Sequence, residues 1–533
     1  MYQSKSVLII DDSPIIQSAT RLVLQRCGFK PNLIVSASSA ADAVRMCQTR
    51  RFDILLVDFN LGLGSTGLQL LERLRRDNML SHNPLLFVIT AEESLSVVMG
   101  FAEFEPTDYL VKPLRPDMMQ QRLMAAFHQH DLDASVITSY RNGGIPAVRE
   151  TLKLAKTPDA FKKSATMLAK YMVRKGERPA AISMLQSFIQ KHDYLPAKTL
   201  LADLLMGEKR LPEAEIVIDA LWAQNNKSIS VMDLNARKAI QEGKASSAFV
   251  TLQQAHQSCP YNLTRLFCLI WLGQTLYLSN EADKYVLEAA ATLHKSVWNL
   301  PDYYCLLAAV MLEGQLVKEQ PTEIWLRLSQ QKAISPQERP FFNIVRAHNS
   351  AIQGNQLAAY RFLIATKSEE AKDITQQSFE FHFVSYQTCC HLGMFQGMRS
   401  AMSALSKLAT EEQNATLKTI KQCWVKQEVA RLRTNEKYDE AMAFYRDKQF
   451  RMAARKIISI WPDNRFDITL ARCIVALACQ KILTPEHHST LITEARWTFE
   501  ARHTLPDWYQ ALVQKYDLLK QPLGLHPTGD AIA

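Results

Sequence analysis

The sequence predicts two folds in series: an α/β domain built on a doubly wound, five-stranded parallel sheet, and then an all-α region. Two observations lead to this prediction. Over residues 1–128 short apolar runs recur, and a polar or charged residue ends most of them. Beyond about residue 146 the apolar residues instead recur at helical spacing, and a chain of 533 residues has room for both parts.

Four of the apolar runs are strand candidates with polar residues directly after them. They are residues 7–10 before Asp11 and Asp12, residues 54–57 before Asp58, residues 85–89 before Thr90, and residues 109–111 before Lys112. The carboxyl ends of parallel strands share one edge of a sheet, where doubly wound folds build their sites. We therefore expect these polar side chains to gather in one place.

The acidic members of this set predict a metal site. Asp11, Asp12 and Asp58 would repel one another at a single sheet edge, and a divalent cation removes that repulsion. Mg²⁺ binds carboxylates together with a backbone carbonyl oxygen and water molecules. Asn60, two residues after Asp58, is placed to lend that carbonyl, so the expected cofactor is Mg²⁺.

Lys112 and Thr90 predict that the same site accepts a phosphoryl group. A phosphoryl group on Asp58 would bring charged oxygens that need a cation and a hydroxyl donor besides the metal. Taken singly, each of these residues could simply cap a turn or a helix, or lie on the surface. Their joint occurrence at matching strand ends favours a phosphoacceptor site.

The set resembles the receiver domain of two-component response regulators, the CheY-like family with a flavodoxin-like fold, over residues 4 to about 128. The strings that carry the resemblance, in family order and spacing, are VLIIDDS (7–13), ILLVDFNLG (54–62), LLFVITA (85–91) and DYLVKP (108–113). A pseudo-receiver that kept these residues but lost phosphorylation is the alternative. The segment from Glu103 to Thr107 departs from the small residues that many members carry, so dimerisation through the family's common face, and any homo-oligomer, is left open.

The resemblance implies a role for each residue of the site. Asp58 is the phosphoacceptor, and Asp11 and Asp12 hold Mg²⁺. Thr90 and Lys112 bind the phosphoryl oxygens. The implied phosphodonor is a sensor histidine kinase or a phosphotransfer protein.

The resemblance also implies how the site switches and how long its phosphoryl group lasts. Tyr109 is the switch aromatic, which moves inward together with Thr90, and the Lys112-Pro113 bond is cis. Asn60 and Glu92 tune the lifetime of the acyl phosphate. In the family this pairing accompanies fairly quick self-dephosphorylation, so we expect a transient signal.

The charge distribution, the cysteine spacing and the hydropathy argue against a nucleic-acid-binding, a disulfide-bonded and a membrane-spanning protein. Residues 1–130 hold 13 Lys and Arg against 13 Asp and Glu, so the net charge of +9 lies in the rest of the chain, where it is dispersed. A nucleic-acid interface needs a clustered basic stripe, so nucleic acid is not the expected partner.

The ten cysteines contain no C-x-x-C pair, which fits buried free thiols in a reducing compartment. No signal segment precedes the first strand and no apolar run reaches the roughly 18 residues of a membrane span, so we expect a cytoplasmic protein without membrane insertion.

Four segments are expected along the chain. They are the receiver over residues 1–128, a linker over residues 129–146, a helical domain over residues 147–520 and a flexible tail over residues 521–533. The linker is placed at a polar stretch that contains Asn142, Gly143 and Gly144.

The helical region shows a repeated spacing of small residues. Its glycines fall 30 to 41 residues apart, as expected if each ends the first helix of a hairpin; they are Gly176, Gly207, Gly243, Gly273, Gly314, Gly354 and Gly393. Alanine pairs twelve residues apart accompany them at 169/181, 202/214, 236/248 and 347/359. This spacing resembles the tetratricopeptide repeat over residues 160–260, and more weakly to about residue 465. An irregular helical bundle is the alternative.

The helical region predicts a binding function. A stack of helical hairpins has no intrinsic catalytic apparatus and usually binds segments of partner proteins, and the region contains no phosphate-binding loop, metalloprotease or nucleophile-elbow motif. The predicted protein is a response regulator in which phosphorylation of Asp58 gates protein binding, with no enzyme activity beyond self-phosphorylation from a phosphodonor and autodephosphorylation. Its domain order resembles regulators of the VieB kind. A DNA-binding transcriptional response regulator and an enzyme of unrecognised type are the alternatives.

Overall fold

The structure, a computed structural model, describes most of the chain. The described residues are 4–62, 66–81, 84–90, 100–101, 104, 106–225, 228–276, 279–296, 298–330, 333–366, 376, 378–392, 394–433, 435–463, 468–500, 509–510, 513–514 and 519. Glu92 and the predicted tail over residues 521–533 lie outside them.

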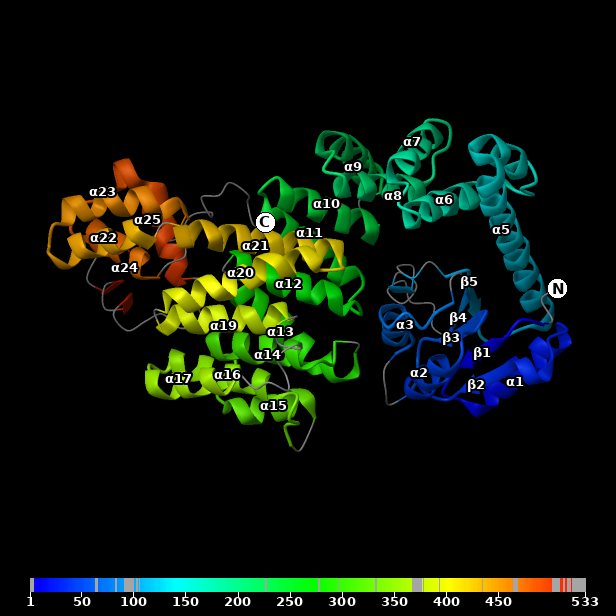
Figure 1. Ribbon diagram of the computed structural model, residues 1–533, viewed down its shortest axis with the longest axis horizontal. Helices are drawn as coiled ribbons and strands as arrows, with labels where there is room; N and C mark the ends of the chain where they lie inside the picture. Colours follow the sequence, from blue (N-terminus) through cyan, green and yellow to red (C-terminus); the bar gives the residue numbers. More distant parts are fainter. Residues whose placement is uncertain are drawn as a thin grey trace. The chain divides into compact units, whose positions relative to one another are not determined.

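The N-terminal part is built on the parallel sheet that the sequence predicts (Figure 1). Its five strands have the order β2-β1-β3-β4-β5, and every neighbouring pair is parallel. The bounds are β1 Val7–Ile10, β2 Ile34–Ala37, β3 Ile54–Asp58, β4 Leu85–Thr90 and β5 Asp108–Val111. The order reverses direction beside β1, which is the arrangement of a doubly wound fold, so the predicted fold class is confirmed.

Helices cover both faces of this sheet because alternate strand residues point to opposite sides. Leu8 and Leu55 belong to the core that is shared with α2 (Ala40–Thr49) and α3 (Gly67–Arg76). Ile9 and Leu56 belong to the core that is shared with α1 (Pro14–Arg26) and the start of α5. All four strand residues are at most 1% exposed, which explains why the strands read as unbroken apolar runs.

The predicted linker is not an irregular segment. Residues 129–146 lie within α5 (Pro116–Leu152), a helix of 37 residues that continues out of the sheet domain. One residue interrupts it: Gly144 has φ 62° and ψ −157°, a conformation that is nearly restricted to glycine. The polar composition of the segment reflects a solvent-exposed helix with a break, and not a loop.

All elements after α5 in the described part of the chain are helical (Figure 1). They are α6 Pro158–Arg174, α7 Arg178–Ile189, α8 Leu195–Gly207, α9 Leu211–Asn225, α10 Ile229–Gln241, α11 Ala245–Ser258, α12 Leu263–Leu276, α13 Ser279–Thr292, α14 Pro301–Glu313, α15 Pro321–Ser329, α16 Arg339–Ile352, α17 Gln356–Ala365, α19 Phe379–Leu392, α20 Phe395–Glu411, α21 Ala415–Arg433, α22 Asn435–Arg446, α23 Phe450–Ile460, α24 Ile468–Cys479 and α25 Pro485–Glu500, with short 3-10 turns after α13 and α23. The predicted all-α region is confirmed.

The small residues of the predicted repeat lie where two helices of a hairpin meet. The paired alanines at 169/181, 202/214, 236/248 and 347/359 are all at most 2% exposed. Gly176, Gly243 and Gly354 follow the first helices of their hairpins with positive φ, as the spacing predicts. Gly273 is different, because it lies buried inside α12 and does not end it. Gly393 lies outside the described residues.

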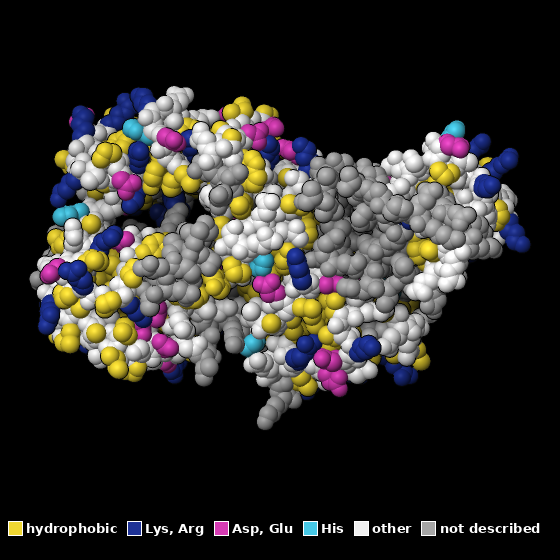
Figure 2. Space-filling model, turned by 180° about the vertical axis from the view of Figure 1, so that it is seen from behind, with side chains coloured by type: hydrophobic (Ala, Val, Ile, Leu, Met, Phe, Trp, Pro, Cys, Tyr) yellow, Lys and Arg dark blue, Asp and Glu magenta, His cyan; other side chains and the backbone are white. Residues whose placement is uncertain are grey.

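The chain forms two compact units. One contains residues 1–235 together with 255–262 and 295–297, and the other contains residues 236–254, 263–294 and 298–533. Both signs of charge are scattered over the described surface on the face that Figure 2 shows. No helix among the described residues is long and apolar enough to cross a membrane.

Candidate phosphoacceptor site

The carboxyl ends of three strands bring three predicted site residues into contact. Asp11 follows β1, Asp58 ends β3, and Lys112 follows β5. The Nζ atom of Lys112 donates to Asp11 Oδ2 at 2.7 Å and to Asp58 Oδ2 at 2.7 Å. The side chains of Asp11 and Asp58 are 3% and 8% exposed, and that of Lys112 is 15% exposed. One ammonium group therefore offsets part of the negative charge of two buried carboxylates.

Burial sets the acid–base properties of this cluster. It raises the pKa of the Asp58 carboxyl, and the Lys112 ammonium offsets only part of that rise. For Lys112 burial acts in the opposite direction, but the hydrogen bonds to Asp11 and Asp58 outweigh it, so the pKa of Lys112 is raised and the side chain stays charged. A second cation at the site would favour ionised Asp58.

The acidic residues fit a divalent cation. One oxygen each of Asp11, Asp12 and Asp58 lie within 4.8 Å of one another. Asp12 is exposed while the other two are buried, so an ion held there would keep part of its water shell, as Mg²⁺ prefers. The side chain of Asn60 accepts a hydrogen bond from the Gly62 amide at 3.2 Å, and the predicted role of its backbone carbonyl remains a prediction.

Two residues that the sequence reasoning did not single out hold Asp11 in place. The Ser13 amide donates to Asp11 Oδ1 at 2.9 Å, and the same residue caps the N-terminus of α1. The Gln17 side chain, one turn into α1, donates to the Asp11 carbonyl oxygen at 2.6 Å. The string Asp-Ser-Pro is a recognisable helix start, so Ser13 could have been found, whereas nothing in the sequence marks Gln17.

Gly67 lies against the backbone of the phosphoacceptor candidate. Its amide donates to the Phe59 carbonyl oxygen at 2.8 Å. A Cβ atom at this position would lie 2.1 Å from the backbone oxygen of Asp58, a distance that no side chain can adopt. The start of α3 and the end of β3 are thus in direct contact through a glycine.

The predicted switch residues are only partly described. Tyr109 lies in β5, is half-buried, and packs against the core shared with α3. Burial raises the pKa of Tyr109 to about 12, so its hydroxyl stays protonated. Thr90 ends β4 beside Val111, but its side chain lies outside the described residues, as does Glu92. The Lys112-Pro113 bond is cis.

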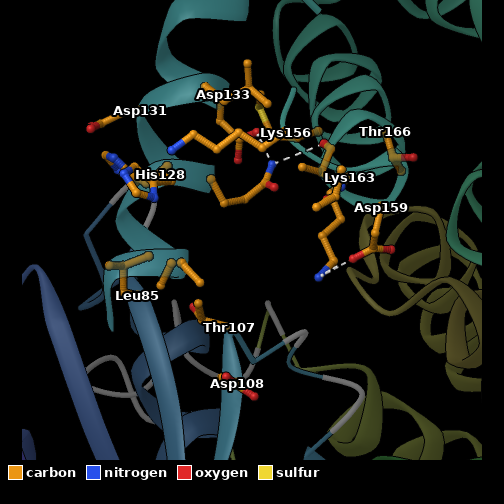
Figure 3. Close-up of a pocket in the computed structure, with 18 of the residues that line it drawn as sticks. Leu85, Thr107, Asp108, His128, Asp131, Asp133, Lys156, Asp159, Lys163 and Thr166 are labelled. Carbon is orange, nitrogen blue, oxygen red and sulfur yellow. Dashed lines mark hydrogen bonds and ion pairs between the residues drawn. The ribbon is translucent and has the colours of Figure 1, made fainter. Parts of the chain in front are cut away.

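A large hollow lies at the opposite edge of the sheet (Figure 3). It has a volume of 1060 Å³ and is lined by the starts of β4 and β5, including Leu85, and by α5 and α6. Arg122 pairs with Asp108 at 2.9 Å, and Lys163 pairs with Asp159 at 2.9 Å. Because this hollow is at the amino ends of the strands, it is not part of the phosphoacceptor site.

The site combines a doubly wound sheet with two buried aspartates, an exposed third aspartate and a bridging lysine at the carboxyl edge. This is the arrangement expected of a phosphoacceptor domain. The family model for the response regulator receiver domain matches residues 7–124. The N-terminal part of the chain is therefore a receiver domain, as the resemblance implied.

Curated relatives match about a quarter to a third of the chain. The transcriptional regulatory protein AfsQ1 of Streptomyces coelicolor is 25% identical over 193 residues, which are 36% of this chain and 81% of that protein. The chemotaxis protein CheY of Pseudomonas aeruginosa is 29% identical over 123 residues, which are 23% of this chain and 96% of that protein. A solved structure of the chemotaxis protein CheY4 of Vibrio cholerae is 25% identical, covers 23% of this chain and 98% of that chain, and gives a TM-score of 0.21.

Proposed function

We propose that this protein is a phosphorylated response regulator: a histidine kinase or phosphotransfer protein transfers a phosphoryl group to Asp58, and this controls protein binding by the helical region. The observation that carries the proposal is the contact of Lys112 with both Asp11 and Asp58 at 2.7 Å. The lysine lies where it can bind an oxygen of a phosphoryl group on Asp58 without a large movement.

In the proposed transfer, an Oδ atom of Asp58 attacks phosphorus as the bond from phosphorus to the donor's histidine nitrogen breaks. Mg²⁺ held by Asp11, Asp12 and Asp58 would supply charge stabilisation when bound. Lys112 exchanges its contact with Asp58 for one with a phosphoryl oxygen and keeps its contact with Asp11. The new charge at the end of β3 then shifts the equilibrium of the Thr90 and Tyr109 side chains, which is how receivers transmit a signal.

Labelling with acetyl phosphate tests the phosphoacceptor. We expect the wild-type protein to gain the mass of one phosphoryl group in the presence of Mg²⁺, and Asp58→Asn to gain none. Asp53→Asn is the matched control, because Asp53 directly precedes the same strand and is bound by Ser6 and Lys5 at the other edge of the sheet. Labelling that survives Asp58→Asn, or that is lost in Asp53→Asn alone, would contradict the assignment.

The binding output is tested by a comparison of partners retained by wild type and by Asp58→Ala. Lys112→Ala and Thr90→Ala should remain folded and lose the effect of phosphorylation on binding. Equal affinity for a partner with and without the phosphoryl group in wild type would count against a gated output.

A DNA-binding output is the second candidate, because AfsQ1 and the phosphate regulon protein PhoB of Pseudomonas aeruginosa are both named as transcriptional regulatory proteins. The scattered charges on the face in Figure 2 favour protein binding instead. Salt-dependent retention on DNA, measured with the phosphorylated chain, would favour the second candidate over the first.

A further inference from the structure

Three helices of the second compact unit bring two histidines and a glutamate together. Glu313 is the last residue of α14, His348 lies in the third turn of α16, and His391 lies at the end of α19. Glu313 Oε2 is 3.3 Å from His348 Nε2 and 3.1 Å from His391 Nε2. One ligand atom from each of the three residues lies within 4.8 Å of the other two.

The environment of His348 indicates which of its ring nitrogens carries a proton. The side chain is 0% exposed, so both nitrogens depend on protein partners. The Thr388 hydroxyl donates its only proton to the Val384 carbonyl oxygen at 2.7 Å, so towards His348 Nδ1, 3.4 Å away, it can only accept. Nδ1 is thus the ring nitrogen that donates to Thr388, and Nε2 is the ring nitrogen that faces Glu313.

Nε2 of His348 faces a carboxylate. His348 Nε2 is a buried atom without a well-formed hydrogen bond, although Glu313 Oε2 is 3.3 Å away. A buried ring nitrogen needs a partner, because burial removes the water that would otherwise bind it. A cation between Nε2 and the carboxylate would be bound by both.

We propose that Glu313, His348 and His391 bind one divalent transition-metal ion of the Zn²⁺ class. Two imidazoles and one carboxylate are a ligand set for such ions, whereas Mg²⁺ and Ca²⁺ favour oxygen ligands alone. The site is independent of Asp58 and of the proposed phosphorylation.

The geometry of the cluster fits this class of ion. Ligand atoms about 2.0–2.1 Å from a tetrahedral ion lie about 3.4 Å apart, and the two distances here are 3.3 and 3.1 Å. The three ligand atoms need to move apart only slightly to admit the ion. The Glu313 and His391 side chains are 40% and 34% exposed, so solvent reaches the site and water can complete the coordination.

The buried ligand has a fixed orientation. A metal-bound histidine almost always donates its second ring N–H to an oxygen, and Thr388 Oγ1 is the acceptor that the structure offers to His348 Nδ1. Since α14, α16 and α19 each supply one ligand, the ion would join three hairpins whose ligands are up to 78 positions apart in the chain.

Titration of the full-length, chelator-treated protein with Zn²⁺ tests the proposal, with excess Mg²⁺ present to occupy the acidic receiver site. We expect one strong equivalent by calorimetry. Co²⁺ as a second probe should give a visible d–d absorption band with the intensity of a low-coordinate site. Because removal of even an outer-shell partner typically costs about 10–100-fold in metal affinity, Glu313→Gln and His391→Ala should each weaken binding by at least that factor.

Two controls separate this site from adventitious binding. His382→Ala alters a histidine of the same helix, α19, outside the cluster, and His487→Ala breaks up the adjacent pair His487 and His488. Both variants should bind Zn²⁺ as wild type does. His348→Ala removes a fully buried side chain and could fail to fold, so the test depends on the two partly exposed ligands.

The proposal is overturned by any of three results. These are the absence of a strong Zn²⁺ equivalent in the wild-type protein, unchanged affinity in Glu313→Gln and His391→Ala, or loss of the strong equivalent in His487→Ala. In the first two cases the cluster is only a carboxylate paired with two imidazoles.

Discussion

At the scale of single residues, Lys112 is the side chain that holds the acidic site together. It lies between Asp11 and Asp58, both of which are nearly inaccessible to solvent. Its removal would leave two buried carboxylates without a cation, and an uncompensated buried charge costs more than the net value of the pair that was lost.

We predict that Lys112→Ala lowers the free energy of unfolding by about 1–3 kcal/mol in the presence of a chelator, and that Mg²⁺ recovers part of this loss by supplying the missing positive charge. The measurement is urea denaturation with and without Mg²⁺. Lys153→Ala is the control, because its pair with Glu150 leaves both side chains at least 70% exposed and should contribute well under about 1 kcal/mol. Equal losses in the two variants would contradict the prediction.

Gly67 is the second residue whose identity is tightly restricted, because there is no space for a Cβ atom at this position. We predict that Gly67→Ala reduces stability by about 1–3 kcal/mol, since the backbone must shift to relieve the overlap with Asp58, and that it slows labelling of Asp58 by acetyl phosphate. Gly207→Ala, at the end of α8, serves as the control because a Cβ atom there meets only the tip of Arg178 at 3.8 Å. Thermal denaturation and the labelling rate would both have to be unchanged in Gly67→Ala for the prediction to fail.

At the scale of helices, the start of α14 lies beside a buried ionic network. Lys421 Nζ is 2.9 Å from Glu380 Oε1 and 2.8 Å from Glu412 Oε2, and the Lys421 side chain is 3% exposed. Burial, followed by the charge of Glu380, raises the pKa of Asp302 in the first turn of α14 to about 7. The folded protein therefore keeps a proton on Asp302 at a pH where the unfolded chain has lost it.

The sign of the resulting pH dependence follows from proton binding. Between about pH 4 and pH 7 the folded state binds a proton on Asp302 that the unfolded chain has already released. The stabilisation by this proton is therefore fully present below the pKa of Asp302 in the unfolded chain. It is lost as the pH rises through about 7, the pKa of Asp302 in the folded protein. Asn cannot titrate. We predict that Asp302→Asn is more stable than wild type at about pH 8 by roughly 1–3 kcal/mol, since each pKa unit corresponds to about 1.4 kcal/mol, and that the difference shrinks towards about pH 5.

The free energy of unfolding is measured by tryptophan fluorescence during urea denaturation. Trp271 is a suitable probe, because its ring lies 5.8 Å from Lys421 of the same ionic network. The matched control is Asp159→Asn at the start of α6, where an aspartate also follows a proline in the first turn but is 63% exposed. The same gain in both variants would show that burial beside Glu380 is not the cause.

At the scale of the whole molecule, every strand of the described residues lies between Val7 and Val111. We predict that a fragment beginning at residue 147 gives a circular dichroism spectrum of helix without strand, because hairpins in a stacked array contact mainly their neighbours. It should also retain the partner of the full-length chain. Substantial strand signal would contradict the architecture, and a stable fragment that binds no partner of the intact chain would contradict the proposed output.

Much of the receiver site can be predicted from the sequence alone, because the strands of the sheet run in the same direction. Parallel strands place their carboxyl ends at one edge, so Asp11, Asp58 and Lys112 had to meet once the apolar runs were recognised as strands. The paired alanines of the helical region were likewise predictable, since helices that approach closely need small residues at fixed positions. The helical conformation of residues 129–146 could not be predicted, because a polar stretch with glycines has the same composition in a loop and in an exposed, broken helix.

The sequence by itself determined the two fold classes, the phosphoacceptor candidate and the spacing of the helical hairpins, because each depends on local periodicity or on chain direction. Only the tertiary structure decided that one lysine bridges two buried carboxylates, that Gly67 touches Asp58, and that Glu313, His348 and His391 converge. These features depend on distances between side chains or backbone atoms of different elements. Such distances are set by side-chain packing, which leaves no periodic trace in the sequence.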